Sequence, residues 1–179
     1  LVKIAEKYHY SFQFTSVFPN LPVSYRLLEA MRQYIAEYDN SFQINVSMHT
    51  TDEAKRRQSF GQYPGLMSFQ EIAEFGRGWV SAVKRRKVNL SYVLMEDNEV
   101  DLRKVTELFD PEYFALRFAL YLPSSAETAE KHTPSSLMRM RETAAQARAL
   151  GYQCIESVAK DIERVWDTRP HSAFKMLVG

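Results

Sequence analysis

Residues 41–50 read SFQINVSMHT, and apolar and polar side chains alternate along them. The apolar positions are Phe42, Ile44, Val46 and Met48, and the polar positions are Gln43, Asn45, Ser47 and His49. Because successive side chains of a β-strand point to opposite faces of its sheet, this pattern predicts a strand with one apolar and one polar face. The polar face must then meet either water or a ligand.

Four other stretches also have the length and composition of strands. They are residues 11–18 (SFQFTSVF), 88–95 (VNLSYVLM), 114–122 (FALRFALYL) and 152–158 (YQCIESV). A segment with helix signals separates each strand from the next. Parallel strands need crossover connections of this length, so the five strands are predicted to pair in parallel.

The first two long helices are predicted from apolar spacing and a capping pattern. The first carries an apolar stripe at helical spacing, made of Leu21, Tyr25, Leu28, Met31, Ile35 and Tyr38. Ser68 and Glu71 form a capping-box pattern that predicts the start of the second. The core side of this second helix would carry Ile72, Phe75, Trp79 and Val83. Gly76 and Gly78 weaken this prediction, and residues 52–57 (DEAKRR) form a short charged segment between the two.

Two further helices follow the third and fourth strands. Asn98 is expected to open one of them, which would end before Pro111. Thr133 and Pro134 are expected to start the other, which would end at Gly151. The tail from Lys160 has no clear pattern.

The resulting order, βαβααβαβαβ, predicts the α/β class and a partial (β/α) TIM-like barrel of about five parallel strands with covering helices. With 179 residues and 45% hydrophobic side chains, the chain is expected to form one domain over residues 1–179. The first residue is Leu1, which suggests that the chain is a fragment or a processed product with a part missing upstream.

Polar positions recur on the other predicted strands, although both faces of a parallel sheet are normally covered and apolar. They are Gln13 and Thr15 on the first strand, Asn89 and Ser91 on the third, and Arg117 on the fourth. If helices cover the apolar face, these side chains line the inside of a curved sheet. A large polar ligand or water would satisfy them. Two alternatives remain open: an internal hydrogen-bond network, or a covering segment that is missing from the chain.

Sites in parallel α/β enzymes lie at the carboxyl ends of the strands, where Ser47, His49 and Arg117 lie or nearly lie. Arg117 stands within an apolar strand, and its guanidinium would suit a carboxylate or phosphate group. A buried ion pair with Glu156 or another acid is the alternative.

The global composition excludes several classes of protein. The formal net charge is +1, from 23 basic and 22 acidic residues, so it does not indicate a polyanion as partner. A single cysteine excludes an internal disulfide framework and suits a cytoplasmic enzyme. No apolar run approaches the length of a membrane span. The four histidines are scattered without a ligand spacing, so we expect no metal site within this chain.

Residues 44–57 (INVSMHTTDEAKRR) resemble a strand and loop of radical S-adenosylmethionine enzymes related to the ribosomal-RNA adenine methyl synthases. That family carries Ser-Leu-His there, followed by an acidic and basic segment. Three further stretches resemble the family in the same order: residues 13–19, 87–109, and 114–123 with 151–158. The resemblance covers roughly residues 12–158, through short and degenerate motifs.

The resemblance implies a set of contacts with S-adenosylmethionine. Ser47, Met48 and His49 match the family tripeptide that contacts this cofactor, and Gln13, Thr15 and Ser16 lie in the strand whose serine does the same. The residues that we expect to contact substrate are Asn45, Ser91 and Arg117.

Other family features have no counterpart in the chain. The Cys-x-x-x-Cys-x-x-Cys motif that binds the [4Fe-4S] cluster is absent, as is the Gly-Glu that holds the cofactor's amino group. The family asparagine of the fourth strand falls near Leu122, and residues 161–167 (DIERVWD) replace the methyl-carrying cysteine. The cluster ligands are therefore expected outside this chain.

The resemblance thus implies the C-terminal part of the barrel of a radical enzyme, with the cluster-binding part upstream of it. S-adenosylmethionine and a [4Fe-4S] cluster would be its cofactors, and methylation or another modification of a nucleic acid or small molecule would be its reaction. RNA is a partner by analogy only. Two alternatives are another α/β-barrel enzyme that binds a phosphorylated or carboxylated molecule through Arg117, and a binding domain that has lost the cluster.

Overall fold

The structure of the protein is a computed structural model that describes residues 12–38, 42–60, 65–83, 86–98, 100–122 and 131–158. Five strands and five helices are described. In chain order they are β1 (Phe12–Ser16), α2 (Pro22–Tyr38), β2 (Phe42–Ser47), α3 (Glu53–Ser59), α4 (Phe69–Val83), β3 (Val88–Leu94), α5 (Leu102–Leu108), β4 (Phe114–Leu120), α7 (Leu137–Ala149) and β5 (Gln153–Ser157). This order confirms the predicted succession of strands and helices.

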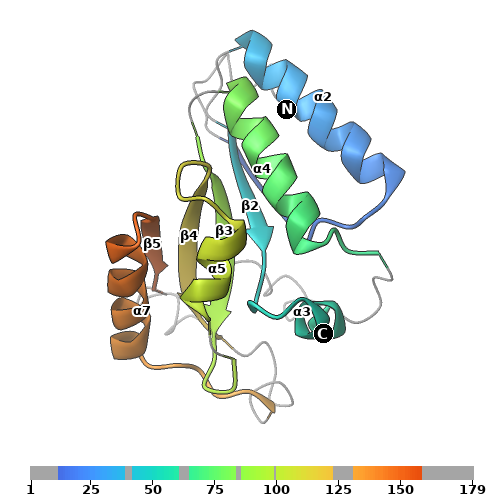
Figure 1. The fold of residues 1–179 in the computed structure, drawn as a ribbon. Helices are drawn as coiled ribbons and strands as arrows, with labels where there is room; N and C mark the ends of the chain where they lie inside the picture. Colours follow the sequence, from blue (N-terminus) through green and yellow to red (C-terminus); the bar gives the residue numbers. More distant parts are fainter. Residues whose placement is uncertain are drawn as a thin grey trace, which may run out of the picture.

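All five strands form one parallel sheet, in the order β1-β2-β3-β4-β5. Helix α4 packs on β3, α7 packs on β4 and β5, and α2 lies against α4. Figure 1 shows the long helices gathered on one side of the sheet. The α/β class is confirmed, and the arrangement is consistent with a partial TIM-like barrel.

The core lies between the sheet and these helices. The sheet contributes alternate side chains that are fully buried, among them Ile44, Val46, Leu90, Leu116 and Phe118. The helices contribute Ile72 and Trp79 from α4 and Met140, Ala144 and Ala147 from α7. Burying a large apolar side chain contributes about 1.5–3 kcal/mol, so this one-sided layer accounts for most of the fold's stability. Ile72 and Trp79 of the predicted apolar stripe of α4 therefore face the sheet.

Helix α4 continues through both of its glycines. A Cβ atom on Gly76 would lie 2.0 Å from Cζ of Phe114 on β4, so the helix approaches the sheet more closely than any other residue would allow. Close packing against β4 thus outweighs the low helix propensity of glycine at this position.

The capping box that was predicted for α4 is present. The Ser68 amide donates to the Glu71 carboxylate across 2.7 Å, and the Glu71 amide donates to Ser68 Oγ across 3.1 Å. The same carboxylate accepts a hydrogen bond from Tyr25 of α2 across 3.1 Å, which joins the two helices.

The predicted starts of α5 and α7 were wrong by a few residues. Asp101, rather than Asn98, caps α5, and its side chain accepts from the Arg103 amide. Ser136, rather than Thr133 and Pro134, caps α7. Asn98 and Pro134 each form an isolated antiparallel bridge with Met95 instead. The charged segment after β2 is itself a helix, α3, capped by Asp52.

The tail from Lys160 and residues 161–167 lie outside the described residues.

Candidate functional site

The polar positions of the strands share the face of the sheet that is opposite to the core. The strand register aligns Thr15 with Asn45 and Asn89 in one row. It aligns Ser47 with Ser91 in the next row, and Ser91 with Arg117. Since aligned residues of neighbouring parallel strands point to the same side, the predicted polar face is formed by residues of four adjacent strands.

The first row is an internal hydrogen-bond network. Asn89 Nδ2 donates to Asn45 Oδ1 across 2.8 Å, and Asn45 Nδ2 donates to Thr15 Oγ1 across 3.2 Å. Asn45 is fully buried and Asn89 is 5% exposed, whereas Thr15 is exposed at the end of the row. For these side chains the alternative of an internal network therefore holds. The predicted contact of Asn45 with substrate stays a prediction.

The second row is more accessible. Ser47, Ser91 and Arg117 are each partly exposed, and Arg117 Nε donates to Ser157 Oγ across 2.9 Å. The terminal nitrogens of Arg117 have no hydrogen-bond partner among the residues that the structure describes. They present N–H groups in the planar arrangement that binds a carboxylate or a phosphate.

Glu156 is not the partner of Arg117, so the part of the alternative that named Glu156 was wrong, and a pair with another acid stays a prediction. The Glu156 carboxylate accepts a hydrogen bond from Arg148 of α7 across 2.6 Å. Glu156 aligns with Phe118 of the core face, and Arg117 is one residue away from that position. Because the strand period is two, the two side chains lie on opposite sides of the sheet.

The three residues of the predicted cofactor tripeptide lie in different environments. Ser47 belongs to the polar face, whereas the Met48 side chain is completely buried in the core. Met48 can therefore contact a ligand on the polar face only through its backbone. His49 has φ 61°, in the left-handed region, and its ring centroid lies 4.8 Å from that of Phe60 in an edge-to-face arrangement. The backbone turns sharply here, directly after β2.

The His49 imidazole is kept neutral by its surroundings. Burial lowers its pKa below the usual 6.5, and the nearby positive charge of Arg56 lowers it further. The ring makes no hydrogen bond to any residue in the described part of the chain, while the His49 carbonyl accepts one from the Asn98 side chain. At neutral pH the ring therefore offers one donor and one acceptor nitrogen.

The remaining predicted cofactor residues are on β1, which is an edge of the described sheet. Gln13 and Thr15 are exposed on the polar face. Ser16 lies on the other side of the strand, and its Oγ accepts a hydrogen bond from the Phe18 amide across 3.0 Å. The structure thus brings Thr15, Ser47 and Ser91 to one face and separates Ser16 and Met48 from it.

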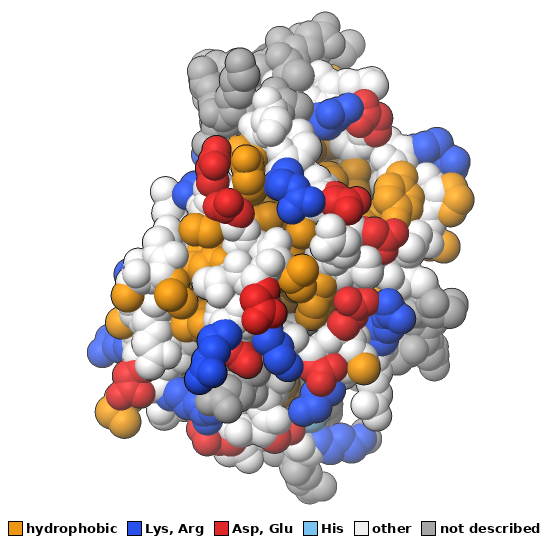
Figure 2. Space-filling view, viewed as in Figure 1, with side chains coloured by type: hydrophobic (Ala, Val, Ile, Leu, Met, Phe, Trp, Pro, Cys, Tyr) orange, Lys and Arg blue, Asp and Glu red, His pale blue; other side chains and the backbone are white. Residues whose placement is uncertain are grey.

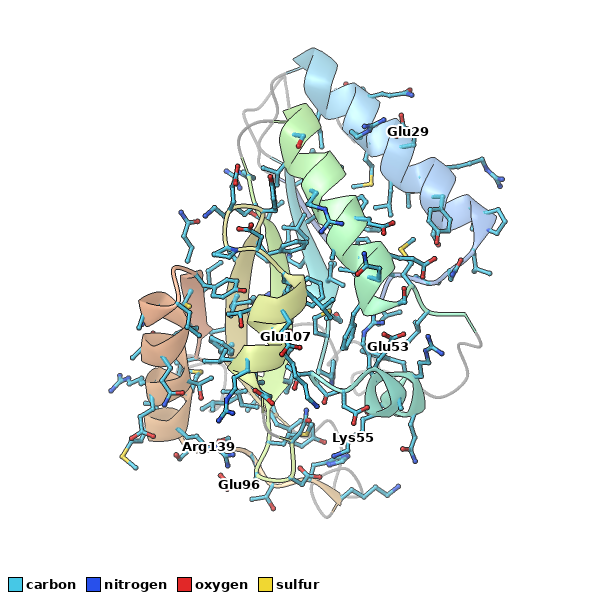
Figure 3. All side chains as sticks on the ribbon, in the orientation of Figure 1. Glu29, Glu53, Lys55, Glu96, Glu107 and Arg139 are labelled. Atoms are coloured by element: carbon cyan, nitrogen blue, oxygen red, sulfur yellow. The ribbon has the colours of Figure 1, made fainter. Side chains whose placement is uncertain are left out.

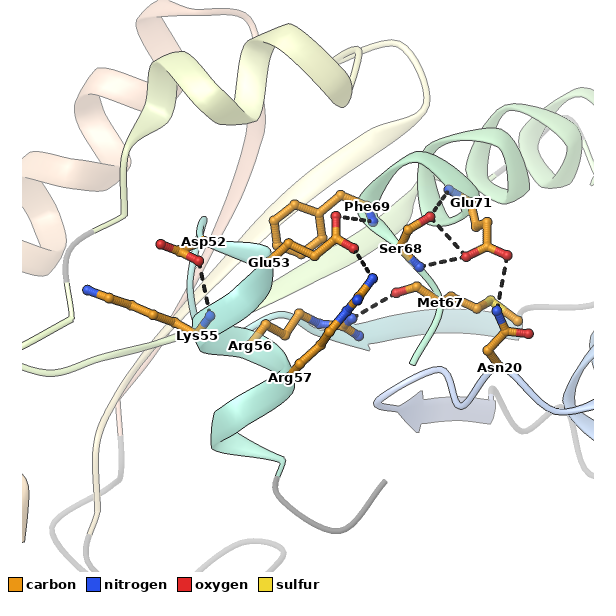
Figure 4. Close-up of polar contacts among 10 residues, drawn as sticks. All are labelled: Asn20, Asp52, Glu53, Lys55, Arg56, Arg57, Met67, Ser68, Phe69 and Glu71. Atoms are coloured by element: carbon orange, nitrogen blue, oxygen red, sulfur yellow. Dashed lines mark hydrogen bonds and ion pairs between the residues drawn. The ribbon is translucent and has the colours of Figure 1, made fainter. Parts of the chain in front are cut away.

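Arg56 is an important residue of this region that the sequence did not single out. It is 0% exposed, although its neighbour Arg57 is exposed and pairs with Glu53 across 2.6 Å. Figure 4 shows the Arg56 guanidinium reaching the Met67 carbonyl from α3. Two adjacent arginines look alike in a sequence. The start of α3 at Glu53 determines that Arg56, and not Arg57, faces inward. The charged segment has no apolar stripe from which the buried side of this helix could be predicted.

An open groove of about 890 Å³ adjoins the carboxyl ends of β2 and β3. Its walls carry charges of both signs, from Asp52, Lys55, Asp101, Arg103 and Lys104. Figure 3 shows Lys55 on α3, and it also shows the pair of Arg139 and Glu96, whose Nη1 and Oε2 atoms are 3.4 Å apart. Figure 2 shows acidic and basic side chains mixed across the same face of the molecule. The mixture gives no independent support to a polyanionic partner.

Comparison with known proteins gives a structural match. The structure is similar to the crystal structure of a radical SAM methyltransferase from Sphaerobacter thermophilus, with a TM-score of 0.57 and 16% sequence identity. The match covers 81% of this chain and 39% of the other, so the chain corresponds to less than half the length of that protein. At this identity the similarity concerns the fold: this chain has an α/β fold of the kind found in that enzyme.

No protein-family model matches the sequence. No curated protein matches it either.

Three observations bear on cofactors and membranes. The described residues contain no group of three or more His, Cys, Asp or Glu side chains that could hold a metal ion. Cys154 is a partly buried free thiol whose pKa is raised by burial. No helix within the described ranges is both long and apolar enough to cross a bilayer.

Proposed function

We propose that this chain is the part of a radical S-adenosylmethionine enzyme that lines its active site. In this role the chain binds the cofactor's nucleoside and shapes the substrate site. The observation that carries the proposal is the accessible row of Ser47, Ser91 and Arg117 on the polar face of a parallel sheet. The fold similarity to a radical SAM methyltransferase supports it.

The groups on this face fit a nucleoside and do not fit a cluster. Hydroxyl groups of Thr15, Ser47 and Ser91 can bond to ribose hydroxyls, and a neutral His49 can both donate to and accept from a polar ligand. The described residues do not include the set of cysteine thiolates that a [4Fe-4S] cluster needs. Residues outside the described part would therefore hold such a cluster. Together with such a cluster, S-adenosylmethionine supplies a 5′-deoxyadenosyl radical.

Each residue would then have a defined task. Ser47 and His49 at the carboxyl end of β2 orient the cofactor, with Gln13 and Thr15 on the neighbouring strand. Ser91 and Arg117 face the substrate, and the terminal nitrogens of Arg117 bind an anionic group on it. Transferase activity and RNA as substrate are proposals that rest on the sequence resemblance and the fold, and a cytoplasmic location is one that rests on the single cysteine.

A second candidate is an α/β-barrel enzyme of another kind, which binds a small carboxylate or phosphate through Arg117. The terminal nitrogens of Arg117 favour this second candidate. No described residue bonds to them, and they could bind an anionic ligand in an enzyme that has no cluster.

The first experiment uses the full-length protein, reconstituted anaerobically with iron and sulfide. We expect the electron paramagnetic resonance signal of the reduced cluster to change on addition of S-adenosylmethionine, with formation of 5′-deoxyadenosine. Ser47→Ala is expected to reduce 5′-deoxyadenosine formation. Ser81→Ala, an exposed serine on α4, serves as the matched control and should leave it unchanged. A protein that forms neither a cluster nor 5′-deoxyadenosine would contradict the proposal and favour the second candidate.

A further inference from the structure

The Arg56 guanidinium joins three separate segments of the chain. Its Nη2 donates to the Val17 carbonyl after β1 across 2.6 Å, and its Nη1 donates to the Met67 carbonyl before α4 across 3.0 Å. Its Nε lies 3.4 Å from the Ser47 carbonyl at the end of β2. One planar group therefore binds the carboxyl ends of two neighbouring strands and the segment that leads into α4.

Aromatic rings enclose this group. The guanidinium carbon of Arg56 lies 5.8 Å from the ring centroids of both Phe60 and Phe69. Both rings are within the range of cation–π attraction, which is strengthened when water is excluded. The side chain is thus held by carbonyl oxygens and by the two rings near it.

No carboxylate forms a salt bridge with Arg56 among the described residues. The nearest acidic residue along α3, Glu53, accepts hydrogen bonds from Arg57 across 2.6 Å and from the Phe69 amide across 3.3 Å. Burial lowers the pKa of Arg56 to about 10, although the Glu53 charge opposes this shift, and the group stays protonated at neutral pH. A buried charge without a direct ion pair is costly, so its retention calls for an explanation.

The segment after Ser47 is fixed by several other contacts. The amides of Met48 and His49 both donate to the Ser91 carbonyl, across 2.9 Å and 3.4 Å. The Asn98 side chain donates to the His49 carbonyl. A histidine in the left-handed region is strained, and such a conformation persists where the surroundings fix it from several sides.

We propose that Arg56 is a positioning residue for His49: it anchors the carboxyl end of β2 so that the chain makes its left-handed turn and holds the imidazole against the Phe60 ring. The positioning itself does not depend on the identity of the ligand, whereas its use in holding S-adenosylmethionine rests on the proposed function. The planar fork of arginine reaches the three carbonyls from three separate nitrogens, whereas the N–H groups of lysine radiate from a single nitrogen and cannot span the same positions.

The positive charge of Arg56 has a second effect on the same histidine. It lowers the His49 pKa, in addition to the effect of burial. Among the described residues, the other groups that contact His49, the Phe60 ring and the Asn98 amide, carry no charge. Arg56 therefore favours the neutral imidazole, which can accept a hydrogen bond from a ligand.

The test compares Arg56→Met and Arg56→Lys in the full chain, with Arg57→Met as the matched control on the exposed side of α3. The His49 ring resonance is followed by NMR during a pH titration and assigned with His49→Asn. Hydrogen exchange of the Met48 and His49 amides is measured in parallel. The His49 pKa reports the effect of the Arg56 charge, and amide exchange reports the effect of the Arg56 hydrogen bonds on the backbone.

In Arg56→Met, the His49 pKa is expected to rise, and exchange of the two amides to accelerate by about tenfold or more, since buried hydrogen bonds to a charged donor are lost. In Arg56→Lys, the pKa should stay low while the amides exchange faster, because the charge remains and the fork does not. Arg57→Met should change neither quantity. If Arg56→Met does not fold, Arg56→Lys still tests the positioning through amide exchange.

Unchanged amide exchange in Arg56→Lys, or the same change in Arg57→Met as in Arg56→Met, would overturn the proposal. Failure of the proposed function is a separate result. It would appear as absence of 5′-deoxyadenosine in the full-length protein, whatever the His49 measurements show.

Discussion

The ring of Phe114 on β4 occupies the space where a side chain on Gly76 of α4 would begin. A Cβ atom there would lie 2.0 Å from Cζ and 2.5 Å from Cε1 of the ring. Phe114 is itself fully buried and packs edge-to-face on Phe109, with ring centroids 5.1 Å apart. The ring has little freedom to move away, so the distance between α4 and the sheet depends on this glycine.

Gly76→Ala is therefore expected to lower the free energy of unfolding by about 1–3 kcal/mol, through overpacking. Gly78→Ala is the matched control, because it lies on the exposed side of the same helix with no atom within 4 Å of its added Cβ. This variant should be more stable by about 0.5–1 kcal/mol, the difference in helix propensity. Urea unfolding measures both, and equal stabilities would contradict the packing of α4 on β4.

Asn89→Ala is expected to cost about 1–3 kcal/mol of stability, because it leaves the buried Asn45 Oδ1 without its donor. The double variant with Asn45→Ala should cost less than the sum of the two single changes, since both remove the same hydrogen bond. Gln13→Ala, at an exposed position of the same face, should change stability by less than about 0.5 kcal/mol. Strict additivity of the two asparagine variants would show that the row is not a network.

The lowered pKa of His49 predicts a loss of stability on acidification. The folded protein binds this proton less readily than the unfolded chain, so stability is complete above the usual pKa of 6.5 and falls as the pH drops below it towards the lowered value. His49→Asn does not titrate there, and asparagine tolerates the left-handed backbone. The free energies of unfolding of the wild type and of His49→Asn are measured at pH 7.5 and at lower pH. On acidification the wild type should lose more of this free energy than the variant does. A pH-independent difference would show that His49 titrates normally.

Ser68→Ala should destabilise the protein by about 1 kcal/mol, because it removes the hydroxyl that accepts from the Glu71 amide at the start of α4. Ser81→Ala, at an exposed position within the same helix, should leave stability unchanged or slightly raised, as alanine has the higher helix propensity. Thermal unfolding of the two variants compares them directly. Equal melting temperatures would mean that the capping box contributes nothing.

The strands and the face that each residue occupies were predictable from alternation alone. The pattern at Asn45 and Ser47 repeats at Asn89 and Ser91, and the parallel register places these positions side by side, with Arg117 next to Ser91. The length of the crossover connections then indicated the direction of the strands. The side-chain period and the connection length are local properties of the sequence, so they predict this part of the fold without a structure.

Contacts that depend on the relative placement of distant segments could not be predicted. The burial of Arg56 depends on the Val17 and Met67 carbonyls, which come from two other parts of the chain. The side chain of Asn98 suits a helix cap, but it bonds to the His49 carbonyl instead. Local preference names the residues that are able to bond, and the tertiary fold selects their partners.

The order of the strands in the sheet is also their order in the chain, and this has a consequence for folding. Each strand pairs with the one that precedes it, so every pairing closes one connection of one or two described helices rather than joining remote ends of the sequence. Short loop closures lower the entropic barrier to folding, and during synthesis the amino-terminal strands are available first. The sheet can therefore grow one strand at a time as the chain leaves the ribosome, with each finished edge serving as the template for the next strand.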